Sequence, residues 1–296
     1  CVNSLVLVMV NEEVVDGVQI HRSKLYFSYK YYLKFNPGIA FKHLKYDLDL
    51  LHVQSLGFFF QDIGVIFRKI FTKTKLINTP HGPFMALENY PFLQKLFREI
   101  YVIFEYPVNY LYDFAVEVNP EQYKWMKKYG FKKVEFISNS IPESIFRKVK
   151  NDNKFKGKFV ISYLGRVQKY KGLEQIVRVL PFLDKKVIFY VMGGEVDNES
   201  NRLKEIAKSL GVLDRVIIAG RVDEDEKLKG LDETDVFILP SEWEAFGIVL
   251  IEAMARGCAL VSTKTEGGKF VVSERNGMLF DYGNIDQLKE ILLKLI

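Results

Sequence analysis

The sequence predicts an α/β protein in which parallel sheets form two domains. Through the first half of the chain, short apolar segments alternate with longer segments of helical periodicity, a pattern typical of βαβ units. The second half shows the same alternation, with strongly apolar strands at 159–164 and 236–239. The chain has 296 residues, which is enough for two domains at about 100–200 residues each.

The composition is typical of a globular protein and argues against membrane-spanning, nucleic-acid-binding and disulfide-rich proteins. Hydrophobic residues make up 48% of the chain and charged residues 27%, and no apolar run reaches the ~18 residues that a membrane-spanning helix needs. The net charge of +5 with scattered lysines suits an anionic substrate or an anionic membrane surface and does not favour nucleic acid. The two cysteines, Cys1 and Cys258, are too few for a disulfide framework or a metal site.

In the first domain, apolar segments predict six strands. The chain begins inside the first of them without a charged segment before it, so we expect no signal peptide and regard the chain as a fragment. The expected strands lie near 4–10, 17–22, 48–54, 75–80, 114–118 and 134–138. Helices are expected at 58–71 and 122–129; the apolar face of the first either packs on its own sheet or lies on a membrane surface.

The strand at 75–80 is followed by His81, a candidate functional residue. Ligands of open α/β sheets bind beyond the carboxyl ends of the strands, which is where His81 stands. Residues 83–113 that follow are unusually aromatic. We expect core packing to account for most of these rings, with a hydrophobic acceptor as the alternative.

A polar, charged segment without periodicity marks the domain boundary. We expect a first domain at 1–147, a linker at 148–158 and a second domain at 159–296.

In the second domain, the strand at 159–164 leads into the loop Gly165–Gly172, which carries Arg166 and Lys171. A guanidinium holds two phosphate oxygens at once and a lysine adds a flexible point charge. Gly193-Gly194 after the next strand, expected at 186–192, fits neither a dinucleotide fingerprint nor a phosphate loop, which argues against a dehydrogenase or an ATPase. A further strand is expected at 215–219, and Asp223–Asp225 is interpreted as the acidic first turn of a helix rather than as a metal site.

The strand at 236–239 leads through a Pro-Ser turn into 246–256, which is apolar on nearly every face and therefore predicts a buried helix. Glu252 is the single carboxylate inside it and needs a partner. The simplest partner is Arg256, four residues on. Gly247 allows a ligand to approach the free N–H groups of the helix start, and Glu244 lies just before it.

The segment Pro240–Gly247, with Glu244 and Glu252 separated by seven residues, resembles the retaining, nucleotide-sugar-dependent glycosyltransferases of the GT-B fold, family 4. The arrangement Gly-Arg-x4-Lys-Gly at 165–172 matches the diphosphate site of that family. The resemblance implies two facing Rossmann-like domains, truncated here at both ends, of which the first lies on the acceptor side and the second binds the nucleotide sugar. The segment Thr265–Gly268 is expected to be a loop over the same site. After Gly268 the family continues with Pro-Glu, whereas this chain has Lys269-Phe270, so the donor contacts of this loop are left open.

The resemblance also implies the residues of the site. Catalytic roles are expected for His81, Arg166, Lys171 and Glu244. Donor-binding roles are expected for Gly165, Arg166, Lys171, Glu244, Ala245, Phe246, Gly247, Ile248 and Glu252. Arg166, Lys171 and the helix start would hold the diphosphate, Glu252 the ribose, and Glu244 the donor sugar. No metal and no cofactor are expected.

The expected function is transfer of a sugar from a nucleoside-diphosphate sugar to a hydroxyl acceptor, with retention and without a metal ion. The alternatives are a sugar-nucleotide epimerase or phosphorylase of the same fold, and a non-catalytic sugar-nucleotide-binding remnant. The expected location is the cytoplasm, with a peripheral contact at the inner face of the membrane left open. We expect this chain by itself to bind donor weakly. The base, the sugar, the acceptor and the oligomeric state do not follow from the sequence.

Overall fold

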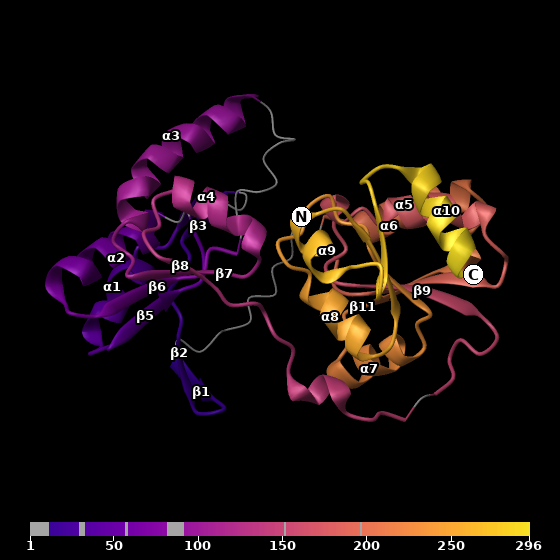
Figure 1. Cartoon of the computed structure of the whole chain (residues 1–296). Coiled ribbons are helices and arrows are strands. Elements are labelled where there is room, and N and C mark those ends of the chain that lie inside the picture. The colour runs from indigo at the N-terminus through magenta and orange to yellow at the C-terminus, as the bar shows by residue number, and fades with distance from the viewer. Residues whose placement is uncertain (1–11, 30–32, 57–58, 82–91, 151, 196) are drawn as a thin grey trace. The chain divides into compact units, whose positions relative to one another are not determined.

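The computed structural model describes residues 12–29, 33–56, 59–81, 92–150, 152–195 and 197–296. The chain divides into two compact units, Cys1–Phe136 and Ile137–Ile296 (Figure 1). The expected strand at 4–10 lies outside the described residues. The segment expected as a linker, 148–158, falls inside the second unit.

The first unit contains a parallel four-stranded sheet in the order β5-β6-β7-β8. Its strands are β5 (Leu50–Val53), β6 (Lys75–Asn78), β7 (Phe114–Glu117) and β8 (Val134–Phe136). They confirm the strands expected from 48–54 onward.

The expected strand at 17–22 exists but does not belong to this sheet. It is β2 (Val18–His21), which pairs antiparallel with β1 (Glu12–Val15). Asp16 and Gly17 between them both have positive φ, 51° and 80°, as a two-residue hairpin turn requires. The Asp-Gly pair is a hairpin signal that the expectation of βαβ units overlooked. A second antiparallel pair is formed by β3 (Phe27–Tyr29) and β4 (Leu33–Phe35).

The helices of the first unit differ in how much apolar surface they bury. They are α1 (Gly38–Phe41), α2 (Phe59–Phe71), α3 (Phe92–Asn109) and α4 (Tyr123–Lys128), with 3-10 helices η1 (Lys42–Lys45) and η3 (Pro120–Gln122). Val65 of α2 is buried in the same cluster as Val53 and Leu76 of the sheet, so α2 packs on its own sheet.

Helix α3 departs from the expectation that core packing accounts for its aromatic rings. Its apolar side chains are largely in solvent, with Phe92 77%, Phe97 70% and Phe104 69% exposed. Further exposed apolar residues of this helix are Leu93, Leu96, Ile100 and Ile103. The expectation was wrong for this helix because a run of apolar residues does not show which face meets the sheet.

The second unit is built on a parallel six-stranded sheet in the order β11-β10-β9-β12-β13-β14. Its strands are β9 (Phe159–Leu164), β10 (Val187–Met192), β11 (Val216–Gly220), β12 (Val236–Leu239), β13 (Ala259–Thr263) and β14 (Gly277–Phe280). Every residue of β10 and β12 is buried, as near-continuous apolar runs predict for a parallel sheet covered on both faces.

Helices cover both faces of this sheet. Figure 1 shows α5, α6 and α10 on one side of it, and α7 and α8 on the other. The helices are α5 (Glu174–Val179), α6 (Glu199–Ser209), α7 (Glu224–Asp232), α8 (Ile248–Ala255), α9 (Glu266–Val271) and α10 (Ile285–Leu295). The 3-10 helices are η4 (Glu143–Phe146), η5 (Lys169–Lys171), η6 (Leu180–Phe182) and η7 (Leu213–Arg215). This arrangement confirms the predicted α/β class.

Candidate functional site

The strand order of the second unit reverses between β9 and β12. From β9 the chain proceeds outward through β10 and β11, and from β12 it proceeds the other way through β13 and β14. The loops that follow β9 and β12 therefore meet where the order reverses, at the edge of the sheet where the strands end. Open α/β sheets bind their ligands at this point. Below, this edge is called the carboxyl edge of the sheet.

Close backbone contacts fix these loops. A Cβ atom at Gly193 would collide with the carbonyl oxygen of Gly165, and one at Gly172 would collide with that of Pro240. The N–H of Glu242 donates to the carbonyl of Tyr170 at 2.8 Å, which ties the two loops to each other. The glycines at these positions therefore allow the loops to pack tightly at the carboxyl edge.

Arg166 is exposed at this edge, while its backbone is held in place. The hydroxyl of Tyr163, a buried residue, donates to the carbonyl of Arg166 at 2.9 Å. The guanidinium itself donates to the hydroxyl of Tyr170 at 3.2 Å. Within the described part of the chain no carboxylate pairs with Arg166, so its positive charge is available to an anion.

Lys171 and Glu244 form an ion pair across the two loops. The Lys171 Nζ lies 2.7 Å from the Glu244 Oε2, and the side chains are 12% and 19% exposed. The structure thus brings together two of the residues selected from the sequence, but each neutralises the other. Because a lysine ammonium has three donors, Lys171 can hold Glu244 and still contact a second anion.

Helix α8 begins at Ile248, later than the expected start at Phe246. Gly247 has φ 78° and ψ 57°, a left-handed conformation that stops the helix from extending backward. The first N–H groups of a helix have no partner within it and attract negative charge. Phe246, Gly247 and Ile248 therefore present a helix start at the same edge as Arg166 and Lys171.

The expectation that this helix is buried on nearly every face was wrong. Leu250 and Ala253 are buried, but Ile248 is 43% and Met254 41% exposed. Apolar residues alone did not show that one face lies at the surface of the unit.

Glu252 does have a partner, but it is not Arg256. The Lys227 Nζ of α7 lies 2.9 Å from the Glu252 Oε1, and the side chains are 13% and 12% exposed. Arg256 instead donates to Asp232 at 2.7 Å and to the carbonyl of Ile145 at 2.9 Å. Lys227 was missed because it stands 25 residues before Glu252 on another helix, and no local spacing indicates the pair.

The segment Thr265–Gly268, expected as a loop, is the start of helix α9. Thr265 caps this helix, since its side chain accepts from the N–H of Gly268 at 3.0 Å. The N–H of Gly267 donates to the carbonyl of Glu244 at 2.9 Å, and a Cβ at Gly267 would collide with Phe246. The Gly-Gly pair therefore allows α9 to pack on the loop that carries Glu244.

The acidic segment at 223–225 caps a helix, as the sequence indicated. The Asp223 side chain accepts from the N–H of Glu226 at 2.8 Å, and Glu226 accepts from the N–H of Asp223, a capping box at the start of α7.

His81 lies in the first unit, after the carboxyl end of β6. Its φ of 53° is left-handed, and its Nε2 lies 3.3 Å from the Gln54 Oε1. Partial burial and the neighbouring His52 lower the pKa of His81 below its usual value. The ring is therefore mostly neutral at physiological pH.

Two further features lie apart from these residues. Cys258 is buried and donates to the carbonyl of Leu231, and burial raises the pKa of its thiol to about 12, which suits a core residue.

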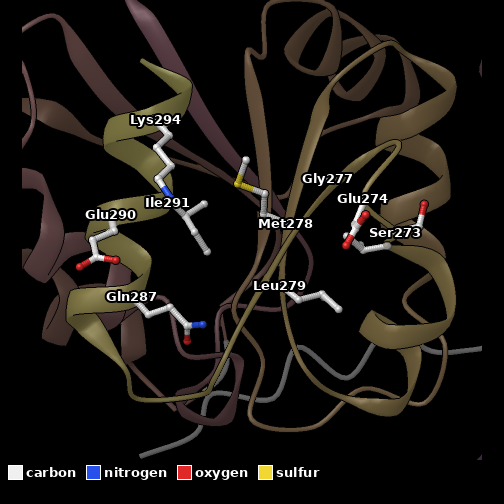
Figure 2. Close-up of a pocket in the computed structure, with 10 residues that line it drawn as sticks. Ser273, Glu274, Gly277, Met278, Leu279, Gln287, Glu290, Ile291 and Lys294 are labelled. Atoms are coloured by element: carbon white, nitrogen blue, oxygen red, sulfur yellow. The ribbon is translucent and has the colours of Figure 1, made fainter.

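A groove of about 700 Å³ lies between β14 and α10 and is lined by Met278, Leu279 and Ile291 among others. Figure 2 shows that its lining comes from these elements and from Ser273 and Glu274, and none of the predicted site residues lines it.

Residues 144–296 match the model of the protein family described as glycosyl transferases group 1. An uncharacterised 41.2 kDa protein of the cps region of Klebsiella pneumoniae is 26% identical over 86% of this chain and 71% of its own length. An uncharacterised glycosyltransferase of Methanocaldococcus jannaschii is 28% identical over 86% of this chain and 68% of its own length.

Solved structures share the architecture at low identity. Sucrose-phosphate synthase of Thermosynechococcus elongatus matches with a TM-score of 0.79 at 20% identity, over 97% of this chain and 76% of that chain. HepE of Anabaena, solved with UDP and glucose, matches with a TM-score of 0.71 at 17% identity, over 86% of this chain and 70% of that chain. At such identities the likeness concerns the fold.

Proposed function

Since the chain belongs to the glycosyl transferases of group 1 and has their GT-B fold, we propose that it transfers a sugar from a nucleoside-diphosphate sugar to a hydroxyl of an acceptor. The proposal includes retention at the anomeric carbon and independence from metal ions and other cofactors. The observation that carries it is the gathering of Arg166, Lys171 and the start of α8 at the point where the strand order reverses.

The chemistry of the donor suits this arrangement. When the sugar leaves, negative charge develops on the diphosphate, and fixed positive groups that face it lower the barrier. Arg166 supplies a guanidinium that pairs with no carboxylate among the described residues, Lys171 an ammonium, and Gly247 with Ile248 the N–H groups of a helix start. These groups can neutralise the charge that other enzymes balance with a divalent ion, so we expect EDTA to leave transfer unchanged.

Two carboxylates serve the hydroxyl groups of the donor in this proposal. Glu252 accepts from the ribose, with Lys227 fixing its orientation through the 2.9 Å contact. Glu244 accepts from the donor sugar, and Lys171 shares its charge between Glu244 and the phosphate. We include His81 of the first unit as a further proposed catalytic residue. We propose no protein nucleophile, because attack by the acceptor hydroxyl on the face that the diphosphate leaves accounts for retention.

Donor binding is tested first with a panel of nucleoside diphosphates in thermal-shift measurements, since a ligand of the folded protein raises its melting temperature. Calorimetry then compares the wild type with Arg166→Ala, which should weaken binding by about tenfold to a hundredfold. Arg178→Ala is the matched control, because Arg178 is an exposed arginine of α5 paired with Glu174. Equal affinity of all three proteins would contradict the proposed site.

Analysis of the products formed without acceptor distinguishes a glycosyltransferase from a sugar-nucleotide epimerase. Incubation of the donor sugar nucleotide without acceptor should give only slow release of sugar. Formation of an altered sugar nucleotide under these conditions would identify an epimerase instead.

We also propose that the first unit contacts a membrane surface through α3. Among the described residues no helix is both long and apolar enough to cross a bilayer. Helix α3 instead exposes Phe97, Ile103 and Phe104 along its length, as interfacial helices do. Phe97→Ser with Phe104→Ser should reduce co-sedimentation with anionic vesicles, whereas Phe182→Ser, at a 60% exposed position of the second unit, should not. Equal sedimentation of both variants and the wild type would contradict this contact.

A further inference from the structure

Glu117, the last residue of β7, is a buried acid. It is 5% exposed, and its Oε2 accepts no hydrogen bond within the described part of the chain. Burial raises the pKa of Glu117 above its usual value. An unpaired carboxylate in such a place is unfavourable, and an apolar residue would fit the strand better.

Its position is that of a ligand-binding residue. β7 is parallel to β6 and β8, so Glu117 stands at the carboxyl edge of the four-stranded sheet. The register pairs Asn78 with Ala115, which places Glu117, two residues later, level with the segment Thr79–His81. At this segment His81 has φ 53°, a conformation that non-glycine residues rarely adopt and that concentrates at functional sites.

Neighbouring polar groups at this edge make hydrogen bonds within the unit, although the Oδ1 of Asn78, like the Oε2 of Glu117, accepts none among the described residues. The Asn78 side chain donates to the carbonyl of Ser55 at 2.8 Å. The His52 ring lies 2.7 Å from the Thr79 hydroxyl.

The polar side chains that follow β7 also make hydrogen bonds within the unit. Asn119 accepts from the N–H of Glu121 at 3.0 Å, and Gln122 accepts from the N–H of Val118 at 3.3 Å. Each of these groups stabilises a turn or a strand end. Among the described residues, the Oε2 of Glu117 stabilises none, so the unit itself leaves the acceptor capacity of this atom unused.

We propose that Glu117 is an acceptor-binding residue, which receives hydrogen bonds from hydroxyl groups of the sugar or polyol to which the donor sugar is transferred. This inference rests on the proposed function, because the chain has an acceptor only if it transfers a sugar. A hydroxyl donates well to a carboxylate, and burial strengthens the bond by excluding water. An aliphatic alcohol with a single hydroxyl offers no second donor beside the reacting one, so Glu117 selects a polyhydroxyl acceptor.

The test uses the full chain and three probes: the methyl α-glycosides of D-glucose, D-mannose and D-galactose. Saturation-transfer-difference NMR measures their affinity for the wild type, Glu117→Gln, Glu117→Leu and the control Glu135→Gln, an exposed acid of the neighbouring strand β8. The wild type and the control should bind at least one glycoside equally well. Glu117→Leu should weaken that binding by at least about tenfold, and Glu117→Gln by less, since it keeps one acceptor oxygen.

Nucleoside diphosphate binding keeps the two proposals distinguishable. Both Glu117 variants should bind the diphosphate like the wild type, and failure of the wild type to bind any diphosphate would overturn the proposed function instead. The Glu117 proposal is overturned if the wild type binds none of the glycosides, or if both variants bind them as the wild type does. Should Glu117→Leu not fold, Glu117→Gln decides, because it is nearly isosteric.

Discussion

At the scale of single residues, Lys171 and Glu244 neutralise each other within the proposed donor site. Their 2.7 Å contact stabilises two charges that would otherwise be partly buried alone. The same contact lowers the positive potential that a diphosphate meets. In the proposed function, the diphosphate meets Arg166 directly but has to share Lys171 with Glu244.

This balance predicts an uncommon result for Glu244→Gln. Removal of the carboxylate charge frees Lys171, so a nucleoside diphosphate without sugar should bind about threefold to tenfold more tightly. Transfer of the sugar should slow in the same variant, because an amide accepts hydroxyl bonds more weakly than a carboxylate. Calorimetry with the diphosphate and a turnover assay measure the two effects. Weaker binding of the diphosphate would contradict the account.

Lys227 gives a second prediction at this scale. Burial alone would lower the pKa of Lys227, but Glu224 and Glu252 outweigh it and raise that pKa, so the ammonium stays charged beside Glu252. Lys227→Met should loosen the Glu252 carboxylate and reduce the preference for a ribonucleoside diphosphate over its 2′-deoxy form by about threefold to tenfold. The control is Lys229→Met, since Lys229 of the same helix pairs with Asp152. An unchanged preference in Lys227→Met would show that Lys227 does not orient Glu252.

At the scale of elements, a buried acid pair links α2 and α3. Asp62 of α2 accepts from the Tyr101 hydroxyl of α3 at 3.1 Å, and Glu105 of α3 is 2% exposed. Burial, with Glu105 beside it, raises the pKa of Asp62 to about 8. The folded protein therefore holds a proton that the unfolded chain releases near the ordinary value of 3.8. The free energy of unfolding falls as the pH rises from that value toward 8.

Asp62→Asn should reduce this dependence, while Glu105, whose pKa burial also raises, should retain part of it. At pH 8 the variant should melt about 2–8 °C higher than the wild type, and the difference should shrink at pH 5. Asp113→Asn, in contrast, should melt at a lower temperature than the wild type. Burial alone would raise the pKa of Asp113, but the N–H of Leu76 and the ammonium of Lys69 lower it, so its charge stabilises the fold. Thermal unfolding from pH 5 to 8 measures both, and a lower melting temperature of Asp62→Asn at pH 8 would contradict the account.

At the scale of the whole molecule, the sequence predicted the buried strands and the loops with local motifs, and it did not predict long-range pairing or exposure. Strands such as β10 and β12 are buried on both faces, so their apolar runs identify them directly. The loop at 165–172 and the segment around Glu244 could be identified because each carries a short motif with glycines, and these glycines allow close backbone contacts. Both are local signals that a single sequence carries.

Long-range pairing and exposure gave no such signal. Nothing in the sequence indicates that Lys227, rather than Arg256, holds Glu252. The apolar face of α3 has the periodicity of a core helix, yet Phe97 and Phe104 lie in solvent. Glu117 could not be distinguished from any other acid at a strand end, because the lack of a partner for its Oε2 among the described residues is a property of the folded unit.

The central claim is that a nucleoside diphosphate binds at the carboxyl edge of the second unit's sheet. Hydrogen–deuterium exchange of the full chain tests it most directly, with the diphosphate that raises the melting temperature most, at saturating concentration. The account predicts slower exchange at 165–172 and 244–250 and unchanged exchange at 272–280, beside the groove of Figure 2. Protection confined to 272–294, with none at 165–172, would contradict it.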